Sequence, residues 1–258
     1  TERNLRPTLY DFLAHRAISF FANGESELVR PEAKFVIDDP DYFGSASVLA
    51  ALNPESNTRT SNTYLAVKTY QDLTRFRAKD NKIAPLIDLE IMRLNFMRSQ
   101  SVSADKDELY LKALKALVSK YPGNEATAEV QYYIAQYYNN SGDTYTVDLP
   151  ETRWHKKKAL TICKLAMEQF PDSYGATLCK QLVATIESKS LSSEAEIAYA
   201  KQENGRVKIS YRNVDSVFVR IINVPADFYT NQRYYGREIL DQLKSKEINK
   251  EMVVKLEN

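Results

Sequence analysis

Between about residue 58 and residue 190, apolar positions recur every three or four residues, which is the period of an amphipathic helix. Short polar or proline-containing breaks divide this stretch into six long segments. An earlier segment, residues 8–21, shows the same period, with a broad face made by Leu9, Phe12, Leu13, Arg16, Ile18 and Phe20. The pattern predicts helices over 8–21, 45–52, 58–79, 82–99, 105–121, 124–140, 153–170 and 173–190, with a loop over 24–44.

Two of these segments repeat one another. Tyr110, Leu114, Leu117 and Pro122 share their spacing of four, three and five residues with Ala159, Cys163, Ala166 and Pro171. This spacing resembles the second helix of a tetratricopeptide repeat, in which small residues let paired helices approach and the proline ends the helix. The prolines are 49 residues apart (171 − 122), whereas that repeat has a period of about 34. We therefore expect a degenerate, right-handed array of helical hairpins with an insertion over 141–154.

After residue 192 the period changes to two, as in a strand with one buried face. The dipeptide Asn204-Gly205 is typical of a tight hairpin turn. The expected elements are strands around Ile197 and Tyr199 and over 206–212, 216–224 and 251–256, and a helix over 234–246.

These patterns predict a mainly α chain made of two domains in series. Residues 1–192 form the helical-repeat domain, and residues 193–258 form a partial β-sandwich with an inserted helix. Three or four strands are too few to bury two sheet faces, so the second domain is expected to be incomplete. Because residue 1 is Thr, we expect a processed or excised piece of a longer protein.

Composition narrows the classes of partner. The 35 Lys and Arg residues nearly cancel the 34 Asp and Glu residues, so the chain lacks the basic excess that attracts nucleic acid. The run Lys156-Lys157-Lys158 is interpreted as a solvated helix face. No stretch approaches the roughly 20 apolar residues that cross a bilayer. Any membrane attachment is therefore expected through an anchor outside these residues.

The sequence predicts no catalytic, cofactor-binding or metal-binding residue. His15 and His155 each stand alone, outside any zinc, nucleophile or phosphate motif. Asp38, Asp39 and Asp41 carry oxygen ligands that suit Ca²⁺, but Asp and Pro are also ordinary loop residues, and that interpretation is favoured.

Cys163 and Cys179 each lie eight residues from Pro171, so they are expected to face each other across a helical hairpin. Two explanations stay open. The pair forms a disulfide, or both are buried thiols that pack as small apolar groups, which is the favoured alternative.

Four tyrosines are the candidate protein-contact residues. Tyr132, Tyr133, Tyr137 and Tyr138 form two adjacent stripes on the helix predicted over 124–140. Core packing is favoured for these side chains. The alternative is that one stripe lines a groove that binds a peptide, since tyrosine is enriched at interfaces.

Three stretches together resemble a known family. These are residues 7–17 (PTLYDFLAHRA), 88–96 (DLEIMRLNF) and 209–221 (ISYRNVDSVFVRI). They are similar to the N-terminal region of the Bacteroidetes-type bacterial alpha-2-macroglobulin-like proteins. In that family the Tyr-Arg-Asn-Val-Asp run, here residues 211–215, joins two strands of the first macroglobulin-type β-domain.

The resemblance implies a non-catalytic region of a large periplasmic or cell-envelope protein, anchored to the outer membrane, that traps or inhibits proteases. Its partners would be other domains of the same chain, and proteases or peptides. The family's thioester needs a Cys followed closely by Glu-Gln, but Cys163 precedes Lys-Leu-Ala and Cys179 precedes Lys-Gln-Leu. Any inhibitory chemistry is therefore expected outside these residues.

Two other functions stay open. The first is a stand-alone tetratricopeptide-type adaptor that binds an extended peptide. The second is a cell-wall-active enzyme on a helical superhelix, which would need two carboxylates roughly 5 to 9.5 Å apart in a cleft. Glu90 and Glu129 are the candidate acids for that pair.

Overall fold

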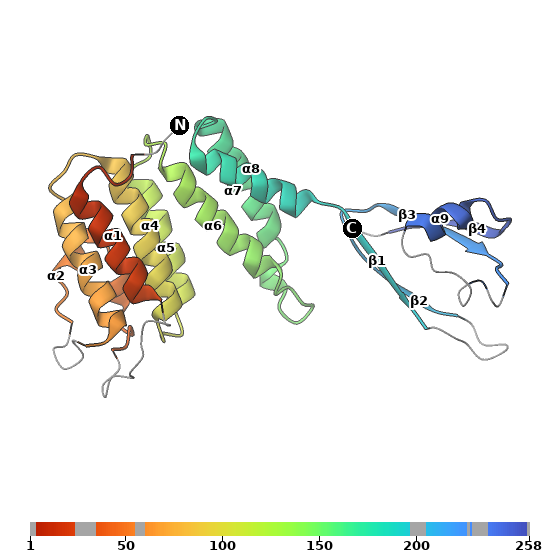
Figure 1. Ribbon diagram of the computed structural model, residues 1–258, viewed down its shortest axis with the longest axis horizontal. Coiled ribbons are helices and arrows are strands. Elements are labelled where there is room, and N and C mark those ends of the chain that lie inside the picture. Colours follow the sequence, from red (N-terminus) through yellow and green to blue (C-terminus); the bar gives the residue numbers. More distant parts are fainter. Residues whose placement is uncertain are drawn as a thin grey trace. The chain divides into compact units, whose positions relative to one another are not determined.

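The computed structural model describes residues 4–23, 35–54, 60–196, 205–225, 228 and 237–256. The chain separates into two compact units, residues 1–186 and 187–258, which we call the helical unit and the strand unit (Figure 1). The predicted order, helices first and a small antiparallel strand region after them, is confirmed. The predicted domain boundary at 192 falls inside the first strand. The type of helical repeat stays a prediction.

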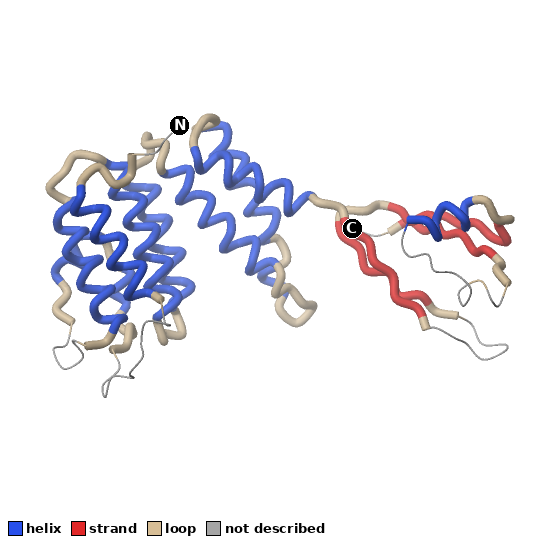
Figure 2. The backbone as a smooth tube through the Cα atoms, viewed as in Figure 1, coloured by secondary structure: helices blue, strands red, loops and turns tan. Residues whose placement is uncertain are grey.

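The long helices lie where the 3.6-residue period places them, to within a few residues (Figure 2). Prolines end two of them, since α5 stops before Tyr121-Pro122 and α7 stops before Phe170-Pro171. The helical unit contains α1 (Leu9–Ala22), α2 (Ala46–Ala51), α3 (Asn62–Arg77), α4 (Ile83–Gln100), α5 (Lys106–Lys120), α6 (Thr127–Gly142), α7 (His155–Gln169) and α8 (Tyr174–Glu187), with short 3₁₀ helices η2 (Pro40–Phe43) and η4 (Pro150–Thr152).

Neighbouring helices pack against one another along the chain. Helix α3 contacts α1, α2 and α4, and the series continues through α4–α5, α5–α6 and α6–α7. Helix α6 also touches α4. One continuous core of buried side chains runs through all of these contacts, and most of its members are aliphatic or aromatic.

Arg77 of α3 forms a buried ion pair that links α3 to α1. Its Nε lies 2.8 Å from Asp11 Oδ1 and its Nη2 lies 2.9 Å from Asp11 Oδ2, and both residues are buried. A third nitrogen, Nη1, lies 2.9 Å from Asp80 Oδ2. Asp11 also accepts hydrogen bonds from the backbone N–H and the hydroxyl of Thr8 in a capping box at the start of α1. The carboxylate of Asp11 therefore caps one helix and ties it to another.

The face predicted for the first helix was wrong. Leu9, Phe12, Leu13 and Phe20 are between 52% and 72% exposed, and of the predicted apolar residues only Ile18 is buried. The buried side of α1 carries Asp11, Ala14, His15 and Ile18. The reason is electrostatic: a buried guanidinium without a carboxylate partner would lose several kcal/mol, so Asp11 turns toward Arg77 and the neighbouring apolar side chains turn outward.

Arg93 of α4 plays a similar part for the segment before α2. It forms an ion pair with Glu90, with Nη2 2.6 Å from Oε2. It also donates to the carbonyl oxygens of Tyr42, at 2.7 Å, and Gly44, at 2.9 Å. These bonds attach η2 and the start of α2 to α4.

Helix α8 crosses α6 at Gly175. A Cβ atom added to Gly175 would collide with the backbone carbonyl carbon of Ala128 and the backbone nitrogen of Glu129. The two helices therefore touch backbone to backbone, which only a residue without a side chain permits.

The strand unit contains two separate antiparallel pairs within its described residues. Strand β1 (Ser190–Ala195) pairs with β2 (Val207–Arg212), and β3 (Ser216–Ile222) pairs with β4 (Ile248–Lys255). Helix α9 spans Arg237–Lys244. The strands predicted over 206–212, 216–224 and 251–256 and the helix over 234–246 are confirmed with shifted ends. The strand predicted around Ile197 and Tyr199, and Asn204 of the predicted turn, lie outside the described residues.

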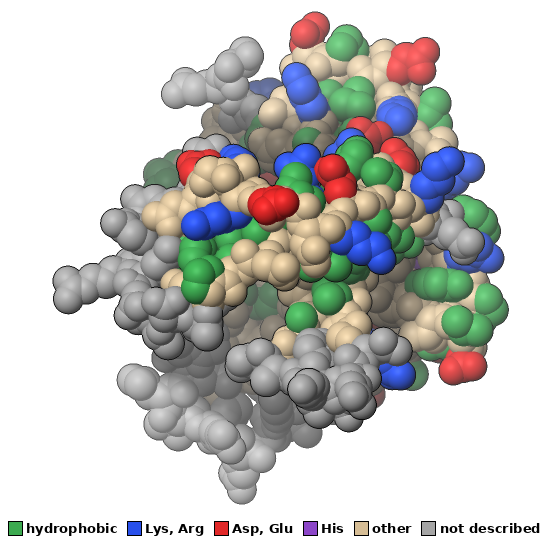
Figure 3. Space-filling view, turned by 90° about the vertical axis from the view of Figure 1, so that its right-hand side faces the viewer, with side chains coloured by type: hydrophobic (Ala, Val, Ile, Leu, Met, Phe, Trp, Pro, Cys, Tyr) green, Lys and Arg blue, Asp and Glu red, His purple; other side chains and the backbone are tan. Residues whose placement is uncertain are grey.

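Both strand pairs leave large apolar side chains exposed. Leu191 of β1 is 53% exposed and Phe218 of β3 is 71% exposed. Figure 3 shows a face on which hydrophobic side chains lie between acidic and basic ones. A two-stranded sheet has too little surface to bury an apolar face of its own.

Among the described residues, no helix has both the length and the hydropathy that crossing a bilayer would take.

Gly175→Ala should destabilise the helical unit by about 1 to 3 kcal/mol, because the added methyl group forces α8 away from α6. The measurement is urea unfolding followed by circular dichroism. Gly123→Ala is the matched control, since a Cβ there meets no atom within 4 Å. Equal stabilities of the two variants would contradict the close crossing.

Candidate functional site

The structure separates the four candidate tyrosines of α6. Tyr138 is buried, 4% exposed, whereas Tyr132, Tyr133 and Tyr137 are half-buried and pack against the edge of the core. The rings of Tyr132 and Tyr133 meet edge to face with centroids 5.2 Å apart, and those of Tyr137 and Tyr138 do so at 5.5 Å. The helix therefore presents one fully packed tyrosine and three that border solvent.

Tyr138 lies where α5, α6 and α7 meet. Its ring centroid lies 5.2 Å from that of His155, and the Nζ atoms of Lys158 and Lys115 lie 4.1 Å and 5.7 Å from the Tyr138 centroid. Burial alone would raise the pKa of Tyr138, but hydrogen bonds with Lys158 and Lys115 and the charges of these two residues lower it below its usual value. These contacts make Tyr138 a packing residue that joins three helices.

Tyr137 faces the pair α4–α5. The guanidinium carbon of Arg98 lies 5.5 Å from the Tyr137 centroid and 4.7 Å from that of Tyr110. The hydroxyl of Tyr110 donates to Asn95 Oδ1 at 2.7 Å, and burial raises the pKa of Tyr110 to about 12. This cluster binds α6 to the preceding hairpin through an arginine held between two rings.

Tyr133 is half-buried on α6, one helical turn after Glu129. Burial raises the pKa of its phenol, and the nearby charge of Glu129 raises it further, with smaller contributions from residues that include Tyr174 and Asp88. Asp88 belongs to α4, Glu129 to α6 and Tyr174 to α8. We call the surface formed by Asp88, Glu129, Tyr133 and Tyr174 the α4–α6–α8 face.

A pocket of about 570 Å³ borders this face at the starts of α6 and α8. The charged side chains that line it, in the part of the chain the structure describes, are Glu125, Glu129 and Asp172. Acidic residues at these positions also stabilise the positive ends of helix dipoles. We call this the acidic pocket; it is lined by Asn4, Leu5, Ala84, Glu125, Ala126, Glu129, Asp172, Ser173, Tyr174, Gly175 and Thr177.

The segment before α1 lies against the same surface. Asn4 and Leu5 line the acidic pocket, and Nη2 of Arg6 lies 3.8 Å from Asp88 Oδ2 and 3.8 Å from Met92 Sδ. Leu5 and Pro7 are half-buried, and residues 4–7 adopt no helix or strand. Residues 4–7 therefore lie against α4, with the basic side chain of Arg6 beside the acidic side chain of Asp88.

His15 is a buried residue next to this surface. Its Nδ1 donates to the carbonyl oxygen of Asp11 at 2.7 Å, and its Nε2 lies 4.0 Å from Asp88 Oδ2. Burial lowers the pKa of His15, and the nearby Arg6 lowers it further. His155 donates or accepts at Ser141 Oγ, 2.9 Å from its Nδ1. Each imidazole thus bonds within the helical unit.

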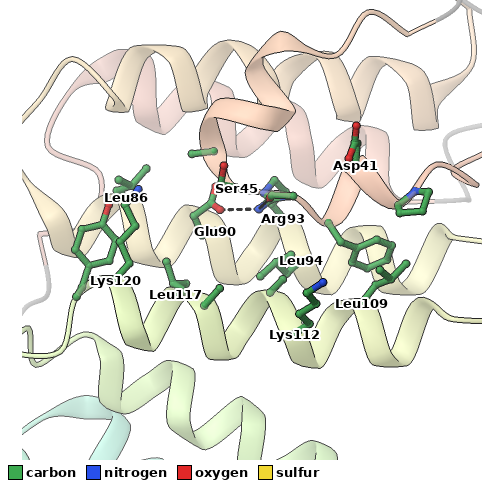
Figure 4. A pocket seen from close by; sticks show the side chains of 17 residues that line it. Asp41, Ser45, Leu86, Glu90, Arg93, Leu94, Leu109, Lys112, Leu117 and Lys120 are labelled. Carbon is green, nitrogen blue, oxygen red and sulfur yellow. Dashed lines mark hydrogen bonds and ion pairs between the residues drawn. The ribbon is translucent and has the colours of Figure 1, made fainter.

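A second cavity, of about 350 Å³, lies between η2–α2 and the pair α4–α5. Figure 4 shows Leu86, Leu94, Leu109 and Leu117 around it, with the Glu90–Arg93 ion pair in its wall. Arg93 already bonds with Glu90 and two backbone carbonyls. The cavity therefore offers mainly apolar contact, with Lys112 and Lys120 among its lining residues.

The structure does not bring Glu90 and Glu129 together. Glu90 lines the apolar cavity and is paired with Arg93, whereas Glu129 lines the acidic pocket. A pair of carboxylates on either side of a glycosidic bond needs one shared cleft. These two residues do not form such a pair.

The remaining candidates have local roles. Asp39 caps η2 by accepting a hydrogen bond from the backbone N–H of Asp41 at 2.9 Å, as the loop interpretation expects. Lys156 pairs with Asp143, and Lys157 lies 5.8 Å from the ring of Trp154. Across the described ranges, no three His, Cys, Asp or Glu side chains are grouped so as to hold a metal ion.

Sequence reasoning missed the acidic pocket and the N-terminal segment beside it. The acidic residues were visible as Glu125, Glu129 and Asp172 around two predicted helix starts. Their convergence was not visible, because it depends on the crossing of α6 and α8 at Gly175. The proximity of Arg6 to Asp88 joins residues 82 positions apart (88 − 6) and has no local signal.

No family model, curated protein or solved structure matches this chain. The resemblance to alpha-2-macroglobulin-like proteins therefore stays a prediction.

Tyr138→Ala should destabilise the helical unit by about 3 kcal/mol, since it empties a site between three helices. Tyr133→Ala should cost less than about half of that, because its ring is only half-buried. Urea unfolding of the two variants measures both losses. Large and equal losses would show that Tyr133 is a core residue and would remove it from any binding surface.

Proposed function

We propose that this chain is a non-catalytic scaffold whose helical unit binds an extended segment of another protein on the α4–α6–α8 face. One observation supports this most directly: Glu129 of α6 and Tyr174 of α8 line one pocket, and the half-buried Tyr133 follows Glu129 by one helical turn on α6. A half-buried aromatic ring beside a pocket lined by polar groups is the kind of surface that protein interfaces favour.

The arrangement of the helices supports a degenerate tetratricopeptide-like array. Helices α5 and α7 carry the two sequence copies, and in both the matching positions are buried. Taking α4–α5 and α6–α7 as successive hairpins makes α4, α6 and α8 equivalent helices. Repeat arrays of this kind bind their partners on a continuous surface built from equivalent helices.

Charge supports a basic partner segment. Three carboxylates line the acidic pocket, and a basic side chain of the chain itself, Arg6, lies 3.8 Å from the nearby Asp88. Opposite charges across an interface steer association and select partners. Residues 4–7 show what such a segment would look like: backbone outside any helix or strand, an apolar residue at the pocket and an arginine beside Asp88.

The test is fluorescence anisotropy with labelled eight-residue peptides that share an apolar frame and carry either Arg or Glu. We expect the Arg peptides to bind more tightly, and raised salt to weaken them. Tyr133→Ala should weaken binding roughly tenfold, the loss typical of an aromatic contact residue. Arg6→Ala should strengthen it, since it removes a cation that lies 3.8 Å from Asp88 and would repel an arginine of the peptide.

Tyr145→Ala is the matched control, because Tyr145 lies in the 141–154 insertion and is already exposed. Equal binding of the Arg and Glu peptides, or binding unchanged by Tyr133→Ala, would contradict the proposal.

A second proposal concerns the strand unit. The exposed apolar side chains of β3 and β4 favour a role in contacting further protein, as expected of a macroglobulin-like β-domain that packs with other domains. The protease-trapping role and the cell-envelope location are part of the same proposal, because both come from the resemblance to macroglobulin-like proteins.

The reading frame around this sequence tests that second proposal. We expect a lipoprotein signal upstream and many further β-domains downstream. A reading frame that contains neither would contradict the macroglobulin assignment while leaving the peptide-binding proposal untouched.

A further inference from the structure

The two cysteines of the chain meet across the α7–α8 hairpin. Cys163 lies on α7 and Cys179 on α8, and both are 0% exposed. Each is eight positions from Pro171 (171 − 163 and 179 − 171), so the turn brings them to the same level. The two thiols lie close enough to shift each other's pKa, and both are free. Burial raises the pKa of Tyr132 on α6, and Cys179 and Cys163 raise it further.

The contact changes the acidity of the pair. The hydrogen bond from Cys179 lowers the pKa of the Cys163 thiol, although burial opposes this, and the same bond raises the pKa of Cys179. A thiol that ionises more readily while its neighbour stays protonated suits thiol–disulfide exchange, in which a thiolate attacks and a second thiol resolves.

We propose that Cys163 and Cys179 form a reversible disulfide that fastens α7 to α8 when the protein meets an oxidised small-molecule thiol such as glutathione disulfide. The Cys163 thiolate attacks one sulfur of glutathione disulfide, and the S–S bond breaks and releases one glutathione. The Cys179 sulfur then attacks Cys163 Sγ and displaces the second glutathione. The protein loses two electrons and two protons, and glutathione disulfide becomes two glutathione thiols.

Burial sets how the exchange proceeds. Neither sulfur is accessible in the closed hairpin, so oxidation requires α8 to move away from α7 or must occur while the chain folds. Once formed, the bond would close residues 163–179 into a loop. It would therefore hold α8, which carries Tyr174 and contacts α6 through Gly175, at the end of the helical unit. This inference does not depend on the proposed peptide binding.

The test equilibrates the full chain in two arms. One arm is native protein in glutathione disulfide, and the other is protein refolded from urea in the same buffer. Acid quenching, alkylation in denaturant and intact mass then count the free thiols. We expect one intramolecular disulfide in the refolded monomer, forming more slowly in the native arm. The oxidised protein should melt roughly 6 to 12 °C above the same protein in dithiothreitol.

A Cys163→Ala/Cys179→Ala double variant is the control, and its melting temperature should be the same in both buffers. Cys163→Ala alone should form no intramolecular bond. Two alkylated thiols after refolding with glutathione disulfide would overturn the proposal. So would disulfide-linked dimers, or an oxidised protein that melts no higher than the reduced one.

Discussion

The burial of two guanidinium groups constrains the first half of the molecule. Arg77 and Arg93 are each about 1% exposed, and a buried charge is tolerated only when its donors are paired. Arg77 takes Asp11 as its partner and so fixes which side of α1 faces inward. Arg93 takes Glu90 and two carbonyl oxygens and so fixes the path of residues 42–44. The position of α1 on α3, and of η2 on α4, follows from these pairings.

The long helices could be predicted from the sequence, whereas the pairing of the buried arginines could not. Helices α3 to α8 were predictable because their apolar period is long and prolines mark two of their ends. The inward face of α1 was not predictable. Asp11 and Arg77 are 66 positions apart, and a hydrophobicity pattern assigns an aspartate to the surface of a helix. Tyr133 and Tyr138 show the limit of spacing as a guide. Both lie on one helix, but Tyr138 packs against Lys115 of α5 and Lys158 of α7, contacts that the spacing along α6 does not show.

The candidate binding surface and the core have complementary chemistry along α6. On one side Ala128 and Ala135 are small enough to let neighbouring helices approach, and both are fully buried. On the other side Tyr133 and Tyr137 are large and half-buried. Helix α6 therefore packs into the core with one side and contributes to the candidate binding surface with the other. The strand unit differs from the helical unit, because many apolar side chains of its described strands are exposed.

The close crossing at Gly175 also offers a way to recognise relatives of this chain. A hairpin turn at Pro171 followed four positions later by a residue lacking a Cβ is a short, local signature. It is imposed by backbone contact and not by any ligand, so divergent sequences that keep this fold should keep it even after their surface residues have changed. A search for this proline–glycine spacing, combined with a small residue at the position of Ala128, could find distant relatives whose overall sequences are no longer similar.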